Sequence, residues 1–230
     1  MYLILEILML VSLGGLIAVF QNDLAGWAVI IKSLTSLLFV LAGLCGYIKR
    51  KENRQISRTI LIALLCSMAG DILLALDKDQ GILFILGVAG FALAHVMFSV
   101  SFCRISPVKK IDFVGMILVF AAEILILCLG TFDFQGLFPV LLGYAAVISF
   151  MVIKALSLWR CRQGRERAVV LTMAGGVLFL ASDILLLFWL FGIGTPKEVQ
   201  SVNWVLYYLA QGCLSASLSC VPGRQRMINY

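Results

Sequence analysis

Five ionisable side chains of this sequence stand inside long apolar runs: Lys32, Asp71, His95, Glu123 and Asp183. An ionisable group at membrane depth is costly unless it is paired or faces a cavity, so each of the five is a candidate functional residue. Two carboxyl groups that share an apolar pocket can divide acid–base work, because burial and repulsion favour one protonated and one ionised group. The two aspartates are therefore candidates for acid–base chemistry at a buried site.

The two aspartates lie in a repeated pattern. The sequence GDILL at 70–74 returns as SDILL at 182–186, an offset of 112 (183 − 71). We interpret this as a duplicated four-helix unit, with repeats at about 1–110 and 111–230, although the pentapeptide could also recur by chance. An even number of spans in each unit gives parallel repeats, so the two aspartates should converge across a pseudo-twofold axis. The same shift pairs Lys32 with Tyr144 and His95 with Tyr207.

The apolar runs predict the elements that hold these residues. The chain is 62% hydrophobic and only 13% charged, with a mean hydropathy of +1.06, which leaves too little polar surface for a soluble globule. Runs of about 20 apolar residues without alternation predict membrane-spanning helices rather than a barrel. We expect an all-α polytopic membrane protein with eight transmembrane helices, at about 2–20, 27–48, 59–76, 81–102, 111–130, 136–159, 168–191 and 201–220.

Short connectors between these runs predict one transmembrane domain, 1–230. The first run carries Glu6, lacks a basic start and offers no cleavage site before Gln21, so we interpret it as a retained span. Basic residues follow the second, fourth and sixth runs, which predicts an integral multi-pass protein with both termini cytoplasmic, in the cell membrane if the source is bacterial. The basic residues are Lys49, Arg50, Lys51, Arg54, Arg58, Arg104, Lys109, Lys110, Arg160, Arg162, Arg165, Arg167, Arg224 and Arg226, against Asp23, Asp77, Lys78, Asp79, Asp133, Lys197 and Glu198 in the alternate loops.

The net charge of +6 therefore indicates membrane topology and contact with anionic lipid headgroups, and we expect no nucleic-acid partner. Seven dispersed cysteines without a CxxC pair indicate apolar packing residues. With a single histidine, a zinc site is not supported, so no metal is expected.

Each buried polar residue also has a structural interpretation. Asp71 and Asp183 could pair with Lys32 or cap a helix, and His95 could hydrogen-bond a backbone carbonyl. Lys32 could extend to the membrane interface, and Glu123, which has no counterpart in the other repeat, could serve as a polar contact between helices. Tyr207 and Tyr208 point about 100° apart on a helix, so we expect only one of them to point inward.

Four segments together resemble the YhhN family, the lysoplasmalogenases. They are SMAGD at 67–71, FALAH at 91–95, GGVLFLASD at 175–183 and YYLAQ at 207–211. The resemblance runs nearly end to end and includes Lys32 early in the second span and Tyr144 in the sixth. The chain departs from the family at Ser33, because a proline usually follows the span-two lysine.

The resemblance implies a membrane hydrolase that cleaves the vinyl-ether bond of lysoplasmalogens to a fatty aldehyde and glycerophosphoethanolamine or glycerophosphocholine. Vinyl ethers yield to acid, so Asp71 and Asp183 would serve as proton donor and anion in either order, and His95 would orient or deprotonate the water. Lys32 would tune an aspartate or bind the lipid phosphate. Tyr144, Tyr208 and Gln211 would hydrogen-bond the glycerol and the ether oxygen. The expected partners are the lysophospholipid substrate and membrane lipids, and no cofactor is required.

Two other functions use the same residues. A proton- or cation-coupled transporter also has repeated spans with buried carboxyl groups, although neither aspartate run has a Gly- or Pro-broken centre. A receptor or lipid-binding scaffold would bind lipid without turnover.

Overall fold

A computed structural model describes residues 2–49, 53–77, 80–162 and 166–220, and these residues are almost entirely helical. Their only β interaction is an isolated bridge between Phe132 and Gly192. Every backbone polar group of a helix interior is paired within the helix, as an apolar surrounding requires. The helices of this described part are α1 (Tyr2–Gln21), α2 (Ala25–Lys49), α3 (Arg54–Leu76), α4 (Ile82–Ile105), α5 (Lys110–Leu129), α6 (Phe138–Ser157), the short η1 (Leu158–Cys161), α7 (Glu166–Phe191) and α8 (Lys197–Cys220).

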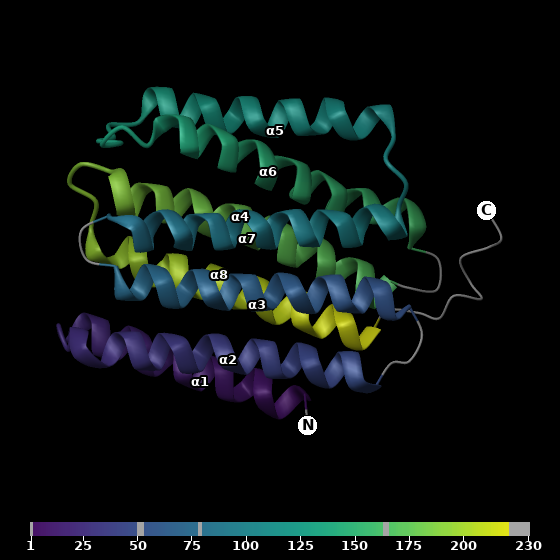
Figure 1. The fold of residues 1–230 in the computed structure, drawn as a ribbon, viewed down its shortest axis with the longest axis horizontal. Helices are drawn as coiled ribbons and strands as arrows, with labels where there is room; N and C mark the ends of the chain where they lie inside the picture. Colours follow the sequence, from purple (N-terminus) through teal and green to yellow (C-terminus); the bar gives the residue numbers. More distant parts are fainter. Residues whose placement is uncertain (1, 50–52, 78–79, 163–165, 221–230) are drawn as a thin grey trace.

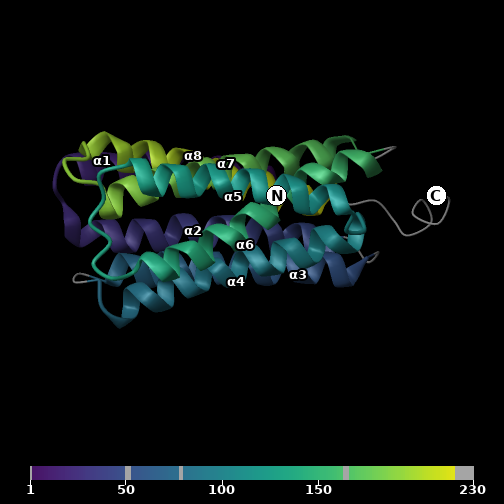
Figure 2. The ribbon, with the colours of Figure 1, turned by 90° about the horizontal axis from the view of Figure 1, so that it is seen from above.

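Consecutive long helices run antiparallel along one axis and stack in two layers (Figures 1 and 2). Helices α3, α4, α7 and α8 form the centre, and the pairs α1/α2 and α5/α6 flank it on opposite sides. Helix α8 contacts α7, α2, α1 and α3, so it is enclosed on several sides.

Seven of the helices, α1 to α7, are long and apolar enough to cross a membrane. Large apolar side chains on their outer faces are exposed, such as Val11 on α1 and Leu118 on α5, which suits contact with lipid. Helix α8 is equally long but carries more polar residues, among them the buried Gln200, Asn203 and Gln211. These features are consistent with an integral multi-pass membrane protein. The expected eighth crossing falls on α8, whose Gln200, Asn203 and Gln211 side chains are buried within the bundle.

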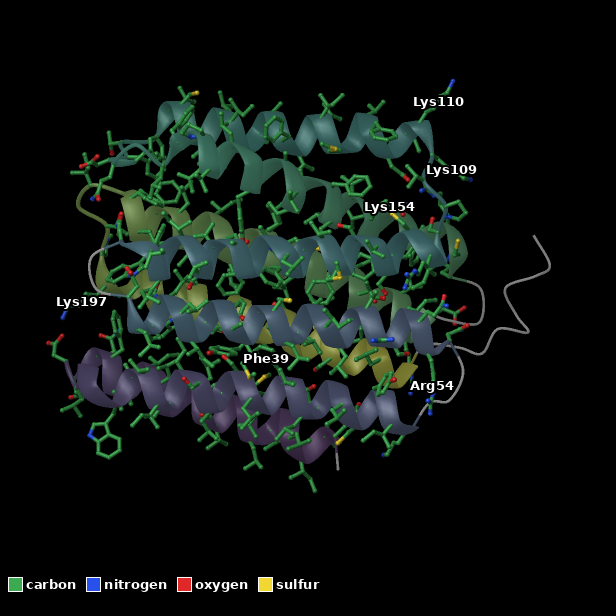
Figure 3. All side chains as sticks on the ribbon, in the orientation of Figure 1. Phe39, Arg54, Lys109, Lys110, Lys154 and Lys197 are labelled. Atoms are coloured by element: carbon green, nitrogen blue, oxygen red, sulfur yellow. The ribbon has the colours of Figure 1, made fainter. Side chains whose placement is uncertain are left out.

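The basic side chains gather at one end of the bundle. Figure 3 shows Arg54, Lys109 and Lys110 at the end opposite Lys197. At the basic end the buried Asp112 carboxylate binds Lys154 Nζ at 3.0 Å and Arg160 Nη2 at 2.6 Å, and this ion cluster links α5 to α6 and η1. Lys154 is fully buried and has a structural role that the sequence did not suggest. The predicted loop charges Arg50, Lys51, Lys78, Asp79, Arg165, Arg224 and Arg226 lie outside the described residues.

Helix positions and helix contacts both follow the 112-residue shift. It carries α2 (25–49) onto 137–161, where α6 and η1 together cover 138–161, and carries α3 (54–76) onto 166–188, within α7 (166–191). Helix α2 contacts α3 and α8, and its counterpart α6 contacts α7 and α4, the counterparts of those helices. The duplication stays a prediction, which these correspondences support.

Glycines allow α3 and α4 to pack closely beside the first aspartate. A Cβ on Gly70 would lie 2.8 Å from the Phe91 ring and 3.0 Å from the carbonyl oxygen of Gly87. A Cβ on Gly90 would lie 3.3 Å from the carbonyl oxygen of Cys66. This close packing fixes the position of Asp71, the residue that follows Gly70 on α3.

Candidate functional site

The Asp71 carboxylate is enclosed by hydrogen-bond donors from α2 and α8. Its Oδ1 lies 3.3 Å from Lys32 Nζ, and its Oδ2 accepts hydrogen bonds from Ser36 Oγ at 2.7 Å and from the Tyr207 hydroxyl at 2.6 Å. The side chain is only 2% exposed. Both oxygens therefore have donors, one of them a cation, which is the arrangement that stabilises an ionised carboxylate.

The Asp183 carboxylate lies in a second cluster, with partners from α6 and α4. Its Oδ2 accepts a hydrogen bond from the Tyr144 hydroxyl at 2.6 Å and lies 3.3 Å from His95 Nε2. His95 Nε2 also lies 2.8 Å from the Tyr144 hydroxyl, so the three side chains form one network. The nearest donor to Oδ1 is Ser182 Oγ at 3.4 Å, and that hydroxyl already donates to the Phe179 carbonyl at 2.7 Å. Asp183 therefore has one oxygen that is well bound and one that is weakly bound.

The two clusters are built in the same way. The 112-residue shift pairs Lys32 with Tyr144 and Asp71 with Asp183, and Tyr207 on α8 corresponds to His95 on α4. Each aspartate thus contacts the preceding helix of its own repeat and the last helix of the other repeat, and Asp71 has one further partner, Ser36, on the preceding helix. This arrangement agrees with a pseudo-twofold axis between the clusters.

The two aspartates do not share one pocket as expected. No hydrogen bond among the described residues joins them, and the fully buried Phe179 lies between their clusters, with ring centroids 5.4 Å from Tyr207 and 4.6 Å from His95. Asp183 lines a cavity of about 80 Å³ and Asp71 does not. The repeat geometry alone cannot give the rotation of each helix, so convergence did not follow from it.

The cavity beside Asp183 is apolar except for three side chains. Leucine, isoleucine, valine and phenylalanine residues from α3 to α7 form its walls, and Asp183, Tyr144 and Glu123 supply its polar groups. Glu123 accepts a hydrogen bond from Ser149 on α6. The two carboxyl groups that face one cavity are therefore Asp183 and Glu123. The sequence marked Glu123 only as a charged residue in an apolar run, and that signal was sufficient to make it a candidate.

The other predicted residues do not line the cavity beside Asp183. His95 is fully buried and contacts two residues that line the cavity, Tyr144 and Asp183. Lys32 lines a second, more polar cavity of about 340 Å³. Tyr208 is fully buried, 3.2 Å from Ser36 Oγ, and Gln211 is fully buried one turn later on α8. Neither of these two residues lines the two cavities described here.

Both tyrosines of the YY pair are buried, so the expectation that only one points inward is wrong. Helix α8 is enclosed by neighbours on several sides, so two directions 100° apart both lead into the protein. Tyr207, which was not among the expected binding residues, is the one that contacts Asp71. Its correspondence to His95 under the repeat was the signal that could have identified it. Among the described residues, no group of three or more His, Cys, Asp or Glu side chains could hold a metal ion.

A helical bundle with lipid-suited faces and buried carboxyl clusters beside cavities defines an integral membrane protein with an internal polar site. The model of the YhhN family matches residues 27–218, which confirms the resemblance found in the sequence motifs. The chain belongs to the YhhN family. No curated protein and no solved structure matches the chain.

Proposed function

We propose that this protein hydrolyses the vinyl-ether bond of lysoplasmalogens and that Asp183 is the proton donor. The observation that carries the proposal is the position of Asp183, a buried carboxyl group bound by Tyr144 and His95 at the edge of an apolar cavity. Membership of the YhhN family, which includes lysoplasmalogenases, supplies the substrate class. The substrate has an alkenyl chain that suits an apolar cavity and a bond that only acid cleaves readily.

The reaction requires a proton on carbon. Asp183 transfers its proton to the vinyl carbon distal to the ether oxygen, which forms a C–H bond and leaves an oxocarbenium ion. Water adds to the carbon beside the oxygen and loses a proton to the Asp183 carboxylate, which restores the acid. The hemiacetal then breaks its bond to the glycerol oxygen and gives a fatty aldehyde and a glycerol hydroxyl. A positioned general acid accelerates such steps by about 10²- to 10⁴-fold.

The contacts of the two aspartates support different roles for them. Asp71 has donors on both oxygens, including the Lys32 ammonium, and is the ionised member. Both close partners of Asp183 lie at Oδ2, where the Tyr144 hydroxyl donates and His95 Nε2 lies 3.3 Å away, which leaves Oδ1 to carry the proton. Because Asp71 does not reach the cavity beside Asp183, its part is to hold Lys32 and the α2–α3–α8 contact in place.

The remaining side chains stabilise the developing charge or position the reacting groups. Glu123 lines the same cavity as Asp183 and is placed to stabilise the oxocarbenium charge, the role of the second carboxylate in glycosidases. Tyr144 holds Asp183 and borders the substrate. His95, which does not line the cavity, is a positioning residue that orients Asp183 and Tyr144. The expected roles of Tyr208 and Gln211 in substrate binding stay predictions.

A coupled transporter has less support from the helices. Both α3 and α7 run unbroken through their aspartates, whereas transporter sites are typically formed by interrupted helices.

The test supplies the full chain, purified in a sugar-headed detergent, with a 1-alkenyl lysophospholipid and with the matched 1-alkyl ether, and measures aldehyde release. We expect turnover of the vinyl ether alone, because the saturated ether has no carbon to protonate. If neither lipid releases aldehyde and the protein instead carries substrate into liposomes, the protein is a transporter.

A further inference from the structure

The polar cavity beside Lys32 occupies the place in the first repeat that the apolar cavity occupies in the second. Five lining positions correspond under the 112-residue shift. At two of them the side chains differ in kind: Lys32 corresponds to Tyr144, and Gln200 on α8 corresponds to Val88 on α4. The other three pairs are apolar in both cavities: Val29 with Leu141, Leu74 with Leu186, and Ala75 with Leu187. The lining of the cavity beside Lys32 thus suits polar groups, and the lining of its counterpart beside Asp183 suits hydrocarbon.

Two buried polar atoms that belong to residues lining this cavity have no protein partner. Trp204 Nε1 and Gln200 Oε1 make no hydrogen bond among the described residues, although their residues are only 6% and 7% exposed. Buried donors and acceptors are nearly always paired, so these two atoms point to a bound polar molecule. The Lys32 ammonium adds further donors, because Asp71 occupies only part of its hydrogen-bonding capacity.

The rest of the lining is aromatic and acidic. Phe20 packs against Trp204 and Trp189, with ring centroids 5.0 Å and 5.8 Å apart. Aromatic rings attract quaternary and primary ammonium groups. The exposed Asp23 belongs to the lining, so the cavity reaches the end of the bundle, where the Asp23 carboxylate pairs with Lys197 Nζ at 2.6 Å.

We propose that this cavity binds the headgroup end of a zwitterionic lysoglycerophospholipid, a proposal that rests on the proposed function. The phosphate accepts hydrogen bonds from Lys32 Nζ and Trp204 Nε1, and the free glycerol hydroxyl donates to Gln200 Oε1. The ammonium group lies among Phe20, Trp189 and Asp23. These groups match the donors, acceptor and rings that the lining presents.

The two cavities adjoin at one side chain. Leu74 on α3 lines both of them, so a lipid with its headgroup in the polar cavity and its chain in the apolar one passes beside Leu74. Leu74 is one turn from Asp71 on the same helix. The reactive bond, which lies between headgroup and chain in a lysoplasmalogen, is then brought toward Asp183.

The test measures binding without turnover. The full-length protein in a sugar-headed detergent is titrated with glycerophosphocholine, glycerophosphoethanolamine or inorganic phosphate, and tryptophan emission is followed, because Trp189 and Trp204 line the cavity. We expect saturable binding of both glycerophosphodiesters, on the order of tenfold tighter than phosphate alone, because phosphate lacks the ammonium group. Equal affinity for inorganic phosphate and for the glycerophosphodiesters would indicate a general anion site and would overturn the proposal.

Substitutions of lining residues test whether glycerophosphocholine binds in this cavity. Lys32→Met should weaken glycerophosphocholine binding roughly tenfold or more, and Gln200→Leu roughly fivefold. Val88→Leu, which places the same side chain at the equivalent position of the apolar cavity without removing a polar group, should retain wild-type affinity for glycerophosphocholine. If Lys32→Met does not fold, the affinities of Gln200→Leu and Val88→Leu for glycerophosphocholine are compared, and this comparison decides whether the ligand binds in the polar cavity. Wild-type binding by Gln200→Leu would overturn the proposal even if the protein releases aldehyde, whereas specific binding without aldehyde release would overturn only the proposed hydrolysis.

Discussion

Removal of Lys32 should destabilise the protein more than removal of Asp71. Lys32→Met leaves the Asp71 carboxylate, 2% exposed, with only the hydroxyls of Ser36 and Tyr207. Breaking a buried ion pair from one side costs about 3–5 kcal/mol. Asp71→Asn keeps an oxygen for the two hydroxyls and leaves the Lys32 ammonium beside a polar cavity, which should cost about 1–3 kcal/mol. The two changes should not add, because the double variant removes both charges.

The free energy of unfolding can be measured by titration with a denaturing detergent, with helical circular dichroism as the readout. The control is Lys197→Met, which removes an exposed partner of Asp23 and should cost less than about 1 kcal/mol. A loss for Lys32→Met no greater than that of Lys197→Met would refute the reasoning that Asp71 is buried as an ion. Strict additivity of the two single variants would also contradict it.

Three further outcomes are expected. Tyr144→Phe removes the 2.6 Å donor to Asp183 and should lower kcat about tenfold in the aldehyde-release assay, with little change in the free energy of unfolding. Glu123→Gln should lower kcat by about 10-fold or more, and an unchanged kcat would remove Glu123 from the mechanism. Gly70→Ala forces a Cβ within 2.8 Å of the Phe91 ring and should cost about 1–3 kcal/mol of stability, whereas Gly14→Ala, with open space around it, should not.

The helical architecture followed from the sequence because membrane depth requires helices of a certain length. The expected span at 81–102 is observed as α4, Ile82–Ile105, and the run at 168–191 lies within α7, Glu166–Phe191. The pairing of Lys32 with Asp71 was among the interpretations of the sequence, and the structure shows it. The polar composition of α8 keeps it outside the seven helices that are apolar enough to span, although it runs through the centre of the bundle.

The orientation of the helices could not be predicted in the same way. Helices that are apolar all round carry no stripe that tells which face meets the protein interior, so sequence alone does not fix where Asp71 and Asp183 point. Their separation into two clusters, the contact of Ser36 with Asp71, and the position of Glu123 beside Asp183's cavity depend on that rotation. The 112-residue shift, in contrast, pairs Tyr207 with His95, and each of these residues contacts one of the two aspartates.

The account depends most on Asp183 as the proton donor, and the kcat for vinyl-ether hydrolysis by Asp183→Asn tests this directly. Asp71→Asn is the matched control, since it makes the same change at the equivalent position of the other cluster. We expect Asp183→Asn to lower kcat about 10²- to 10⁴-fold while the protein stays folded, and Asp71→Asn to lower it less than about tenfold. Full activity in Asp183→Asn, or an equal loss in both variants, would contradict the assignment.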